Sequence, residues 1–447
     1  MATEDQIIVA IELGSSNVTG IAGKKMPDGT ISVQAVVQEP SSMFIRRGMI
    51  FNLTKSAQCI NSIKKQIEER LKRKITQVYV GYSGQGIHSI FNNVGRPLGG
   101  ESRISKEIVD ELEAENLKSD VGNHSILDIV PQSYVVGKET SSDPIGVIAD
   151  SIEVKYMNII ARHALKSNIE NCFKEASLHV AGCILTPVSE AKMLMTDSEK
   201  RSGCVLVDFG ADTTSVVVYK ENKLRYIAVI PLGSANVTKD IESCQLDEQE
   251  AESLKLKYGS AINEIATIEE GKELIYNFPD GSGITKQKFS EIVEARMKEI
   301  LINVAQQIKE SGFDKGTLIG GAIFTGGASA MKNLIPAFKK ATGISQVRVV
   351  RNIPNVLFTK TSGPKETDGR FIAAICILDE GTQNCCGSEY TEDENNGIFD
   401  SQQTVPEHQQ DELKPTDETV KQPKGPGFFK TLSKKLKDIG TTIVGDE

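Results

Sequence analysis

Acids, a glycine and small side chains lie between two predicted buried strands in residues 203–219, GCVLVDFGADTTSVVVY. Residues 205–207 and 216–218 are runs of aliphatic residues, so the segment between them is predicted to turn back as a hairpin. Backbone N–H groups and hydroxyls in such a bend can hold phosphate oxygens, and its acids can hold Mg²⁺. Turns favour Asp, Gly and Thr anyway, so this hairpin alone is weak evidence. The predicted ligand-binding residues are Asp208 for the metal and Gly210, Ala211, Asp212, Thr213 and Thr214 for phosphate.

A second copy of the pattern lies near the N-terminus, in residues 6–22, QIIVAIELGSSNVTGIA. Strands are predicted at 7–11 and 18–22, and Glu12 precedes Asp208 by 208 − 12 = 196 positions. A repeat of such long period indicates two similar domains that face each other across a cleft, where two turns can clamp one polyphosphate. The predicted residues of this copy are Glu12 for the metal and Gly14, Ser15, Ser16 and Asn17 for phosphate.

A third stretch, residues 319–331 (IGGAIFTGGASAM), reads as a strand that runs into a double glycine, followed by a helix beginning near Met331. Glycines at this place let the backbone approach a flat ring or a phosphate closely. The predicted cofactor-binding residues here are Gly326, Gly327, Ala328 and Met331.

In this order, the three stretches resemble the phosphate-1, phosphate-2 and adenosine motifs of the superfamily that holds actin, heat-shock chaperones and sugar kinases. Four more stretches resemble one branch of it, the FtsA family of bacterial cell-division proteins: 78–86 (VYVGYSGQG), 129–136 (IVPQSYVV), 143–146 (DPIG) and 251–259 (AESLKLKYG). The resemblance covers residues 6–380. It implies an α/β fold of two actin-like, ribonuclease H-like domains, with ATP and Mg²⁺ in the cleft.

The resemblance also assigns an adenosine site. Glu252 and Lys255 lie three positions apart on a predicted helix and so share a face. In this superfamily an acid and a lysine so placed reach the ribose and adenine. The alternative is a surface ion pair.

Several positions depart from the superfamily pattern. Hydrolytic relatives place an acid or amide near the start of the helix expected at 184–195, where this chain has Thr186, with Glu190 one turn on. Asp212 and Ser215 stand where Gly and Asp are usual, so Asp212 could coordinate Mg²⁺ through water or could repel phosphate. Glu12 replaces the commoner Asp and still permits a water-mediated Mg²⁺ contact. Nucleotide binding with at most weak ATPase activity is therefore predicted, and no catalytic residue is assigned.

A chain of 447 residues is too long for one core, so several domains are expected. The first half is predicted to comprise 1–84 and 164–200, interrupted by a small α+β subdomain at 85–163. The second half comprises 201–239 and 316–383, with a mostly helical insert at 240–315 and a last helix at 363–378. In the family the small subdomain contacts other division proteins, which implies an interaction module.

Within the helical insert, a long helix is expected at 285–311. Four of its residues resemble the family's groove for the acidic and apolar C-terminal peptide of the tubulin-like FtsZ: Lys286, Lys288, Arg296 and Asn303. A solvated helix face is the alternative.

The C-terminal region changes character at residue 384. Residues 384–427 are mostly acidic, polar and proline-rich, which predicts a disordered linker. Residues 428–447 are predicted to form a short basic amphipathic helix, typical of an in-plane membrane anchor. The alternative is docking on a protein. The membrane-binding residues are predicted to be Phe428, Phe429, Leu432, Leu436 and Ile439 on the apolar side, with Lys430, Lys434 and Lys435. FtsA proteins end in such a helix, which agrees.

Composition narrows the function further. The net charge of −9 argues against generic nucleic-acid binding, and eight cysteines without CxxC spacing are expected to be reduced core residues. Neither a signal peptide nor an apolar run of roughly 20 residues is found, which predicts a cytoplasmic protein.

The predicted role is conformational. ATP would hold the two halves together and favour an actin-like filament, whose C-terminal helices would together bind an anionic membrane. The protein would tether the FtsZ ring to the inner face of the membrane at the septum and recruit later division proteins. A kinase on the same fold, or a pilus-assembly or cell-shape actin homologue, remain alternatives.

Overall fold

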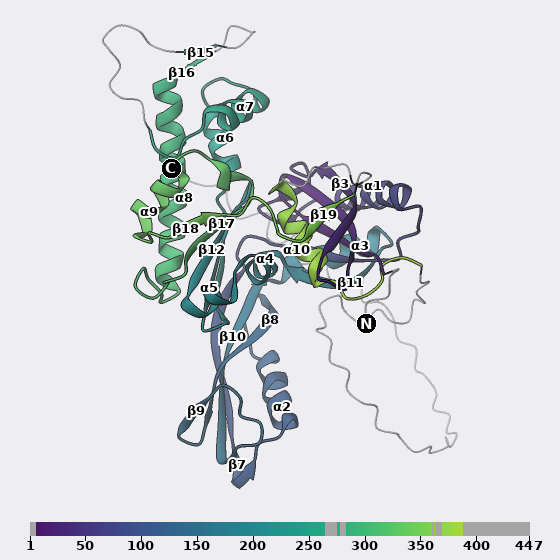
Figure 1. The fold of residues 1–447 in the computed structure, drawn as a ribbon, viewed down its shortest axis with the longest axis vertical. Helices are drawn as coiled ribbons and strands as arrows, with labels where there is room; N and C mark the ends of the chain where they lie inside the picture. The colour runs from purple at the N-terminus through teal and green to yellow at the C-terminus, as the bar shows by residue number, and fades with distance from the viewer. Residues whose placement is uncertain (1–5, 264–274, 278–282, 360–361, 363–368, 388–447) are drawn as a thin grey trace, which may run out of the picture. The chain divides into compact units, whose positions relative to one another are not determined.

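The computed structural model describes residues 6–263, 275–277, 283–359, 362 and 369–387 (Figure 1). Its first sheet has six strands in the order β11-β6-β1-β2-β3-β19. These are β11 (His179–Leu185), β6 (Gln77–Tyr82), β1 (Ile8–Leu13), β2 (Asn17–Lys25), β3 (Ile31–Pro40) and β19 (Val356–Phe358). β1, β2 and β3 are antiparallel, whereas β6, β11 and β19 add in parallel.

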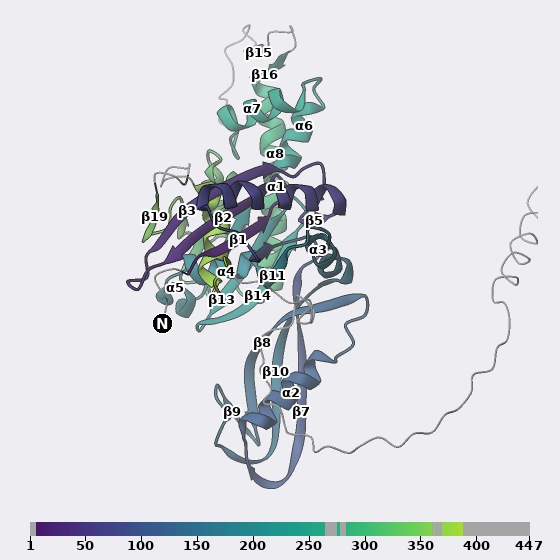
Figure 2. The same cartoon turned by 90° about the vertical axis from the view of Figure 1, so that its right-hand side faces the viewer.

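Helices cover this sheet. Helix α1 (Leu53–Leu71) crosses β2 and β3, with α3 (His163–Glu175) beside it (Figure 2). Its Ile60, Ile63 and Ile67 recur at helical spacing and are fully buried, which explains why this segment folds as a helix against the sheet. The helix ends before Lys72, which adopts a left-handed conformation (φ 56°).

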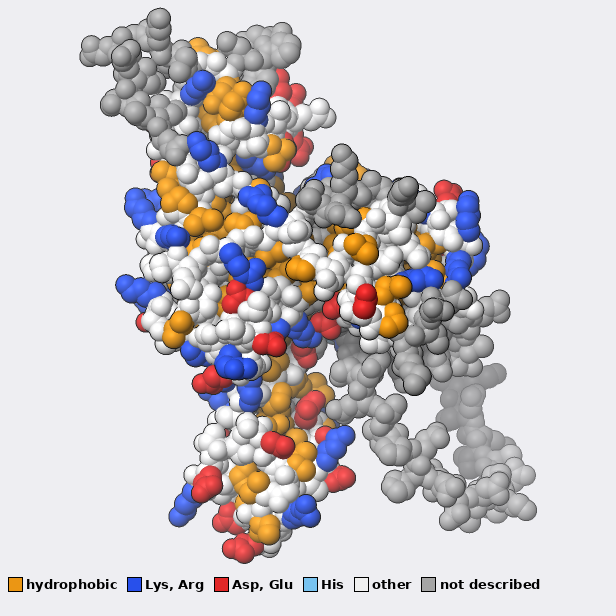
Figure 3. All heavy atoms as spheres, in the orientation of Figure 1, with side chains coloured by type: hydrophobic (Ala, Val, Ile, Leu, Met, Phe, Trp, Pro, Cys, Tyr) orange, Lys and Arg blue, Asp and Glu red, His pale blue; other side chains and the backbone are white. Residues whose placement is uncertain are grey.

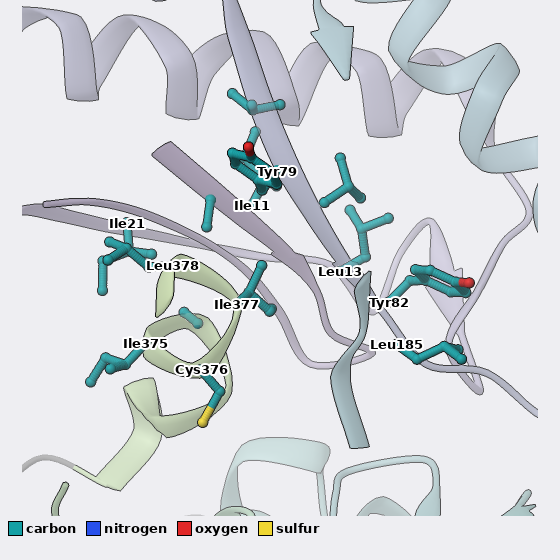
Figure 4. Close-up of a cluster of buried hydrophobic side chains, with 14 of the residues drawn as sticks. Ile11, Leu13, Ile21, Tyr79, Tyr82, Leu185, Ile375, Cys376, Ile377 and Leu378 are labelled. Carbon is teal, nitrogen blue, oxygen red and sulfur yellow. The ribbon is translucent and has the colours of Figure 1, made fainter. Parts of the chain in front are cut away.

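Helix α10 (Ile372–Glu380) packs against β1, β2 and helix α4 (Thr186–Leu194). Figure 4 shows Ile375, Cys376 and Ile377 of α10 within the buried cluster that also holds Ile11 and Tyr79. Full burial of each large apolar side chain contributes roughly 1.5–3 kcal/mol to stability. The last helix, which was predicted to belong to the second half, therefore packs against the sheet of the first half.

The second sheet has nine strands in the order β18-β17-β12-β13-β14-β7-β10-β8-β9. Its first part comprises β18 (Val347–Val349), β17 (Gly321–Thr325), β12 (Cys204–Phe209), β13 (Thr214–Lys220) and β14 (Lys223–Ile230). Its second part comprises β7 (His88–Arg103), β10 (Ile148–Arg162), β8 (His124–Val136) and β9 (Glu139–Ser141), with helix α2 (Lys106–Leu117).

The second part of this sheet is the small unit inserted in the first half of the chain. Long antiparallel pairing of β7, β10 and β8 holds it together. Ala228 of β14 pairs with His88 of β7, so the inserted strands continue the sheet of the second half. The insert lies within the first half of the sequence, so the order of residues along the chain does not reveal that its strands pair with β14.

The helical part of the second half comprises α6 (Ser234–Glu242), α7 (Glu248–Tyr258) and α8 (Lys286–Glu310), with the short strands β15 (Ile275–Asn277) and β16 (Gly283–Thr285). Helix α8 follows closely the helix expected at 285–311. Its apolar side packs into the second core and is fully buried at Phe289, Val293, Met297, Ile300, Leu301, Val304 and Ile308.

The described chain ends on the first sheet. Residues 363–368 of the expected last helix lie outside the described residues, and α10 begins only at Ile372 after a 3₁₀ turn (Gly369–Phe371). Cys385 N–H then donates to Ile7 O (2.8 Å), and Cys385 and Cys386 are buried. The packed chain thus extends past residue 384, which was predicted to be the first residue of the linker. The predicted linker from residue 388 on and the predicted anchor helix at 428–447 lie outside the described residues.

All eight cysteines are free, and six of them are buried. Most of the cysteines are therefore core residues, as expected.

Candidate functional site: two hairpins and a buried carboxyl cluster

The two predicted hairpins have the same register. Leu13 pairs with Val18 across the first, and Phe209 pairs with Thr214 across the second, so each turn holds four residues. The offset between these pairs is 196 positions in both strands, since 209 − 13 and 214 − 18 give the same number. The predicted repeat is confirmed, with the acid of each copy at the end of a strand.

The first hairpin is held from the segment that follows β3. Ser41 Oγ donates to Gly14 O (2.6 Å), and Ser41 N–H donates to Ser16 O (3.0 Å). Gly48 N–H donates to Ser15 Oγ (2.8 Å). Three residues of the turn are therefore fixed by hydrogen bonds from residues 41–48.

The second hairpin is held by the N-terminus of α6. Ser234 N–H donates to Gly210 O (3.0 Å), and Ala235 N–H donates to Ala211 O (2.8 Å). A Cβ on Gly233 would lie 2.3 Å from Ala211 O, so only glycine lets the helix approach this closely. Two N–H groups that a free helix end would offer to a ligand are thus used by the hairpin itself.

Three carboxyl groups from three segments influence one another. Burial, and then the charge of Asp208, raise the pKa of Glu12 to about 8. Burial raises the pKa of Asp208 to about 6. Burial, followed by the charges of Asp208 and Glu12, raises the pKa of Glu190 well above its usual value. Such a cluster favours either protons or a cation between its members.

Polar atoms without partners surround this cluster. Among the described residues, Thr186 Oγ1, Glu190 Oε2, Ser215 Oγ and Thr325 Oγ1 are buried and make no hydrogen bond. Buried polar groups are normally paired, so unpaired ones gathered around acids fit a polar ligand or water. Within the same part of the chain, no group of three or more His, Cys, Asp or Glu side chains has direct metal-ligand geometry.

Glu190 is the residue that sequence reasoning left out of the predicted site. It lies on α4, where Thr186, Ser189 and Glu190 are all at most 4% exposed. Three polar residues on the buried side of one short helix were the available signal.

The third motif lies against the second hairpin. At Gly326 (φ 84°), a Cβ would lie 2.3 Å from Asp208 Oδ1 and 2.5 Å from Phe209 O, so this glycine permits the contact. Gly327 to Ala330 form a 3₁₀ turn, and helix α9 begins at Leu334. The predicted helix start near Met331 is therefore wrong by about one turn, because Met331 is extended (ψ 135°) and Asn333 is left-handed.

The predicted adenosine pair belongs to a buried network. Lys255 is 7% exposed, and its Nζ lies 2.6 Å from Glu252 Oε2. The same ammonium donates to Thr238 Oγ1 (2.9 Å) and Ser234 O (3.2 Å), and Thr238 Oγ1 donates to Glu252 Oε2 (2.6 Å). The pair therefore links α7 to α6, with Lys255 buried and the side chain of Glu252 41% exposed.

The predicted groove residues on α8 do not share one environment. Arg296 binds Asp240 of α6 through two bonds (2.6 and 2.9 Å) and also contacts Glu299. Lys286 Nζ lies 5.4 Å from the centre of the Tyr276 ring, and Asn303 donates to Glu299 O. Lys288 is exposed, together with Lys298 and Ile302 (55% exposed). Figure 3 shows cationic and hydrophobic side chains along the face over this helix.

The stretch IVPQSYVV (residues 129–136) contains Gln132, which connects the inserted unit to the second half. Gln132 is 5% exposed, and its amide donates to Leu224 O (2.9 Å) and accepts from Arg225 Nη1 (3.0 Å). Lys223 Nζ donates to Gln132 O (2.8 Å). The glutamine thus fastens β8 of the insert to β14 of the second half.

Relatives of this chain are similar to it over most of its length. The cell division protein FtsA of Porphyromonas gingivalis is 33% identical over 353 residues, covering 77% of this chain and 72% of the relative. The chain belongs to the FtsA family of cell-division proteins. A model of FtsA matches residues 205–368, and a model of the SHS2 domain inserted in FtsA matches residues 84–160. FtsA of Neisseria meningitidis is 27% identical, covering 85% of this chain and 91% of that protein.

The resemblance inferred from the sequence is confirmed by these matches, as is the actin-like fold class. A chain of the PilM–PilN type IV pilus biogenesis complex superposes with a TM-score of 0.59 at 17% identity, covering 83% of this chain and 97% of that chain. That likeness concerns the fold alone. No helix among the described residues of this FtsA-family chain is long and apolar enough to cross a membrane.

Proposed function

We propose that this FtsA-family chain binds ATP with Mg²⁺ between its two hairpins. The observation that carries the proposal is the pair of register-matched turns, each following a strand that carries an acid, with the charge of Asp208 in the second half raising the pKa of Glu12 in the first. Small residues at both bends leave backbone N–H groups available to phosphate.

The acid cluster supports the metal. Carboxylates whose pKa values are raised by burial and by each other gain most from a nearby divalent cation. Glu12 and Asp208 would hold Mg²⁺ through its water, and the ion would supply charge neutralisation for the phosphates. Ser215 Oγ and Thr325 Oγ1 are unpaired and suited to bind that water.

Hydrolysis is proposed to be at most weak. Thr186 offers a hydroxyl where hydrolytic relatives place an acid or amide, and Glu190 holds its proton more firmly than an ordinary carboxyl group. A group that keeps its proton is a poor base for water.

The cellular role proposed is that of a tether at the cytoplasmic face of the membrane, at the division septum. Subunits with ATP would self-associate into filaments, and the predicted helix at 428–447 would bind anionic lipid weakly in each subunit and strongly in the array. The inserted unit would recruit later division proteins.

The partner proposed for the face over α8 is the C-terminal tail of FtsZ. Exposed Lys288 and Lys298, with exposed Ile302 one turn beyond Lys298 on α8, match an acidic and apolar peptide. Arg296 is already paired with Asp240. Direct binding of the peptide by Arg296 would therefore require this ion pair to open. With the pair intact, Arg296 would act indirectly, by orienting Lys288 and Lys298.

Liposome co-sedimentation with anionic lipid and ATP tests the tether, by comparing the full chain with one ending at Gly427. We expect only the full chain to pellet. Equal pelleting of the two would remove the membrane role of the tail. In parallel, calorimetric titration of the full chain with Mg²⁺ and ATP should give binding that Asp208→Asn weakens about tenfold or more.

Binding of an FtsZ tail peptide tests the partner. Lys288→Glu and Lys298→Glu are expected to weaken it, since each inverts a charge on the proposed surface. Lys309→Glu, an exposed position near the end of the same helix, is the matched control and should bind as the unchanged chain does. Equal loss in all three would mean that net charge alone drives the binding.

A further inference from the structure

The loop between the short strands β4 (Ile45–Arg46) and β5 (Met49–Ile50) contacts both hairpins. Arg47 N–H donates to Asp212 Oδ2 in the second hairpin (2.9 Å). The next residue, Gly48, donates its N–H to Ser15 Oγ in the first (2.8 Å). Two successive backbone donors of one loop therefore bind one hairpin each.

This loop has an uncommon backbone. Arg47 (φ 51°) and Gly48 (φ 72°) are both left-handed, a conformation that costs free energy for a residue such as arginine. A Cβ on Gly48 would lie 2.3 Å from Ser83 O, and Gln85 N–H donates to Arg47 O (2.9 Å). The neighbouring segment therefore holds the loop in the conformation that presents the two N–H groups.

We propose that Asp212 is a positioning residue, whose carboxylate ties the second hairpin to the first half through the Arg47 N–H. The tie sets the separation of the two hairpins before a polyphosphate arrives. A hydrogen bond from N–H to a carboxylate is stronger than one between neutral groups, which favours this tie even though Arg47 is exposed and Asp212 only half-buried. This role differs from both alternatives raised by the sequence, a ligand of Mg²⁺ through water and a repulsive charge. The hydrogen bond itself is present without ligand. Only its effect on polyphosphate binding rests on the proposed nucleotide site.

Amide hydrogen exchange on the full chain without nucleotide tests the tie directly. Asp212→Ala removes the acceptor, whereas Asp212→Asn keeps an oxygen in its place. We expect exchange at the Arg47 amide to rise about tenfold or more in Asp212→Ala and to change by less than about threefold in Asp212→Asn. Asp197→Ala, at an exposed acid on α5 (Asp197–Ser202), is the control. Unchanged exchange in Asp212→Ala would overturn the proposal.

Titration with Mg²⁺ and ATP then separates the three roles of Asp212. A tie predicts affinity reduced about fivefold in Asp212→Ala and nearly unchanged in Asp212→Asn, because only the first loses the acceptor. If Asp212 repels phosphate, both variants bind more tightly. If it holds Mg²⁺ through water, both weaken alike. Either of these last two results would overturn the tie as the determinant of affinity.

An Arg47→Gly variant checks that the backbone is responsible. Glycine keeps the N–H and adopts φ near 51° without strain, so exchange in residues 210–214 and ATP affinity should stay as in the unchanged chain. Loss of affinity like that in Asp212→Ala would assign the effect to the Arg47 side chain and overturn the proposal. If the unchanged chain does not bind ATP, the proposed function fails while the exchange result still decides the tie.

Discussion

The two hairpins have matching sequences and registers but different surroundings. The first is held by side-chain and backbone donors of residues 41–48, and the second by the N-terminus of α6. Glu12 and Asp208 occupy equivalent places, yet the pKa of Glu12 rises to about 8 and that of Asp208 to about 6. The comparison shows that a duplicated motif fixes where functional groups lie, while neighbouring elements fix their charge and mobility.

Gly326→Ala should have the largest effect, on the side of the second hairpin. A Cβ there meets Asp208 Oδ1 and the backbone of Phe209 and forces alanine to φ 84°, so we expect the free energy of unfolding to fall by about 3 kcal/mol or more. Urea denaturation followed by circular dichroism measures this. Gly327→Ala, with open space around it, is the control and should stay within about 0.5 kcal/mol.

Gly81→Ala probes the strand beside the first hairpin, where Gly81 pairs with Glu12 as Thr325, the neighbour of Gly326, pairs with Asp208. The new Cβ would meet the side chain of Ile377 rather than backbone, so the loss should be smaller, about 2 kcal/mol. Adding Ile377→Val should restore part of it in the same denaturation experiment. Additive effects of the two substitutions would contradict the packing described here.

Glu12→Gln should change how stability depends on pH. A carboxyl whose pKa is raised on folding takes up a proton in the folded state, so stability falls as pH rises from about 4.5 to about 8 for Glu12. In EDTA at pH 8.5, Glu12→Gln should therefore be more stable than the unchanged chain, on the order of 1–2 kcal/mol. Asp208→Asn should gain less, and its gain should be complete above about pH 6. If the unfolding free energy of both variants depended on pH as that of the unchanged chain does, the raised pKa values of Glu12 and Asp208 would be refuted.

Thr214→Val should have the smallest effect. Thr214 Oγ1 donates to Leu232 O (2.8 Å), whereas Val18 at the matching position of the first hairpin makes no such bond. Losing this donor should cost about 1 kcal/mol of unfolding free energy, measured in urea. A variant as stable as the unchanged chain would show that α6 alone holds the second hairpin.

Much of the fold follows from local patterns. Hairpin strands, α1 and α8 were predictable because apolar residues recur at periods of 2 and 3.6 along contiguous segments. The start of α9 was not, because Asn333 takes a left-handed conformation that no periodicity announces. The packing of residues 384–387 was missed for a similar reason, since the partners of Cys385 and Cys386 are Ile7 and Ile75, just before β1 and β6 and more than 300 positions away.

The sequence by itself determined the duplicated strand–turn–strand units, their acids and glycines, and the family, because these depend on residues adjacent along the chain. Only the tertiary structure decided that Glu190 joins Glu12 and Asp208, that Asp212 accepts from Arg47, and that Gln132 fastens the insert to β14. Each of these depends on segments distant in sequence. Burial removes water from such groups, and the partners that replace it are set by packing.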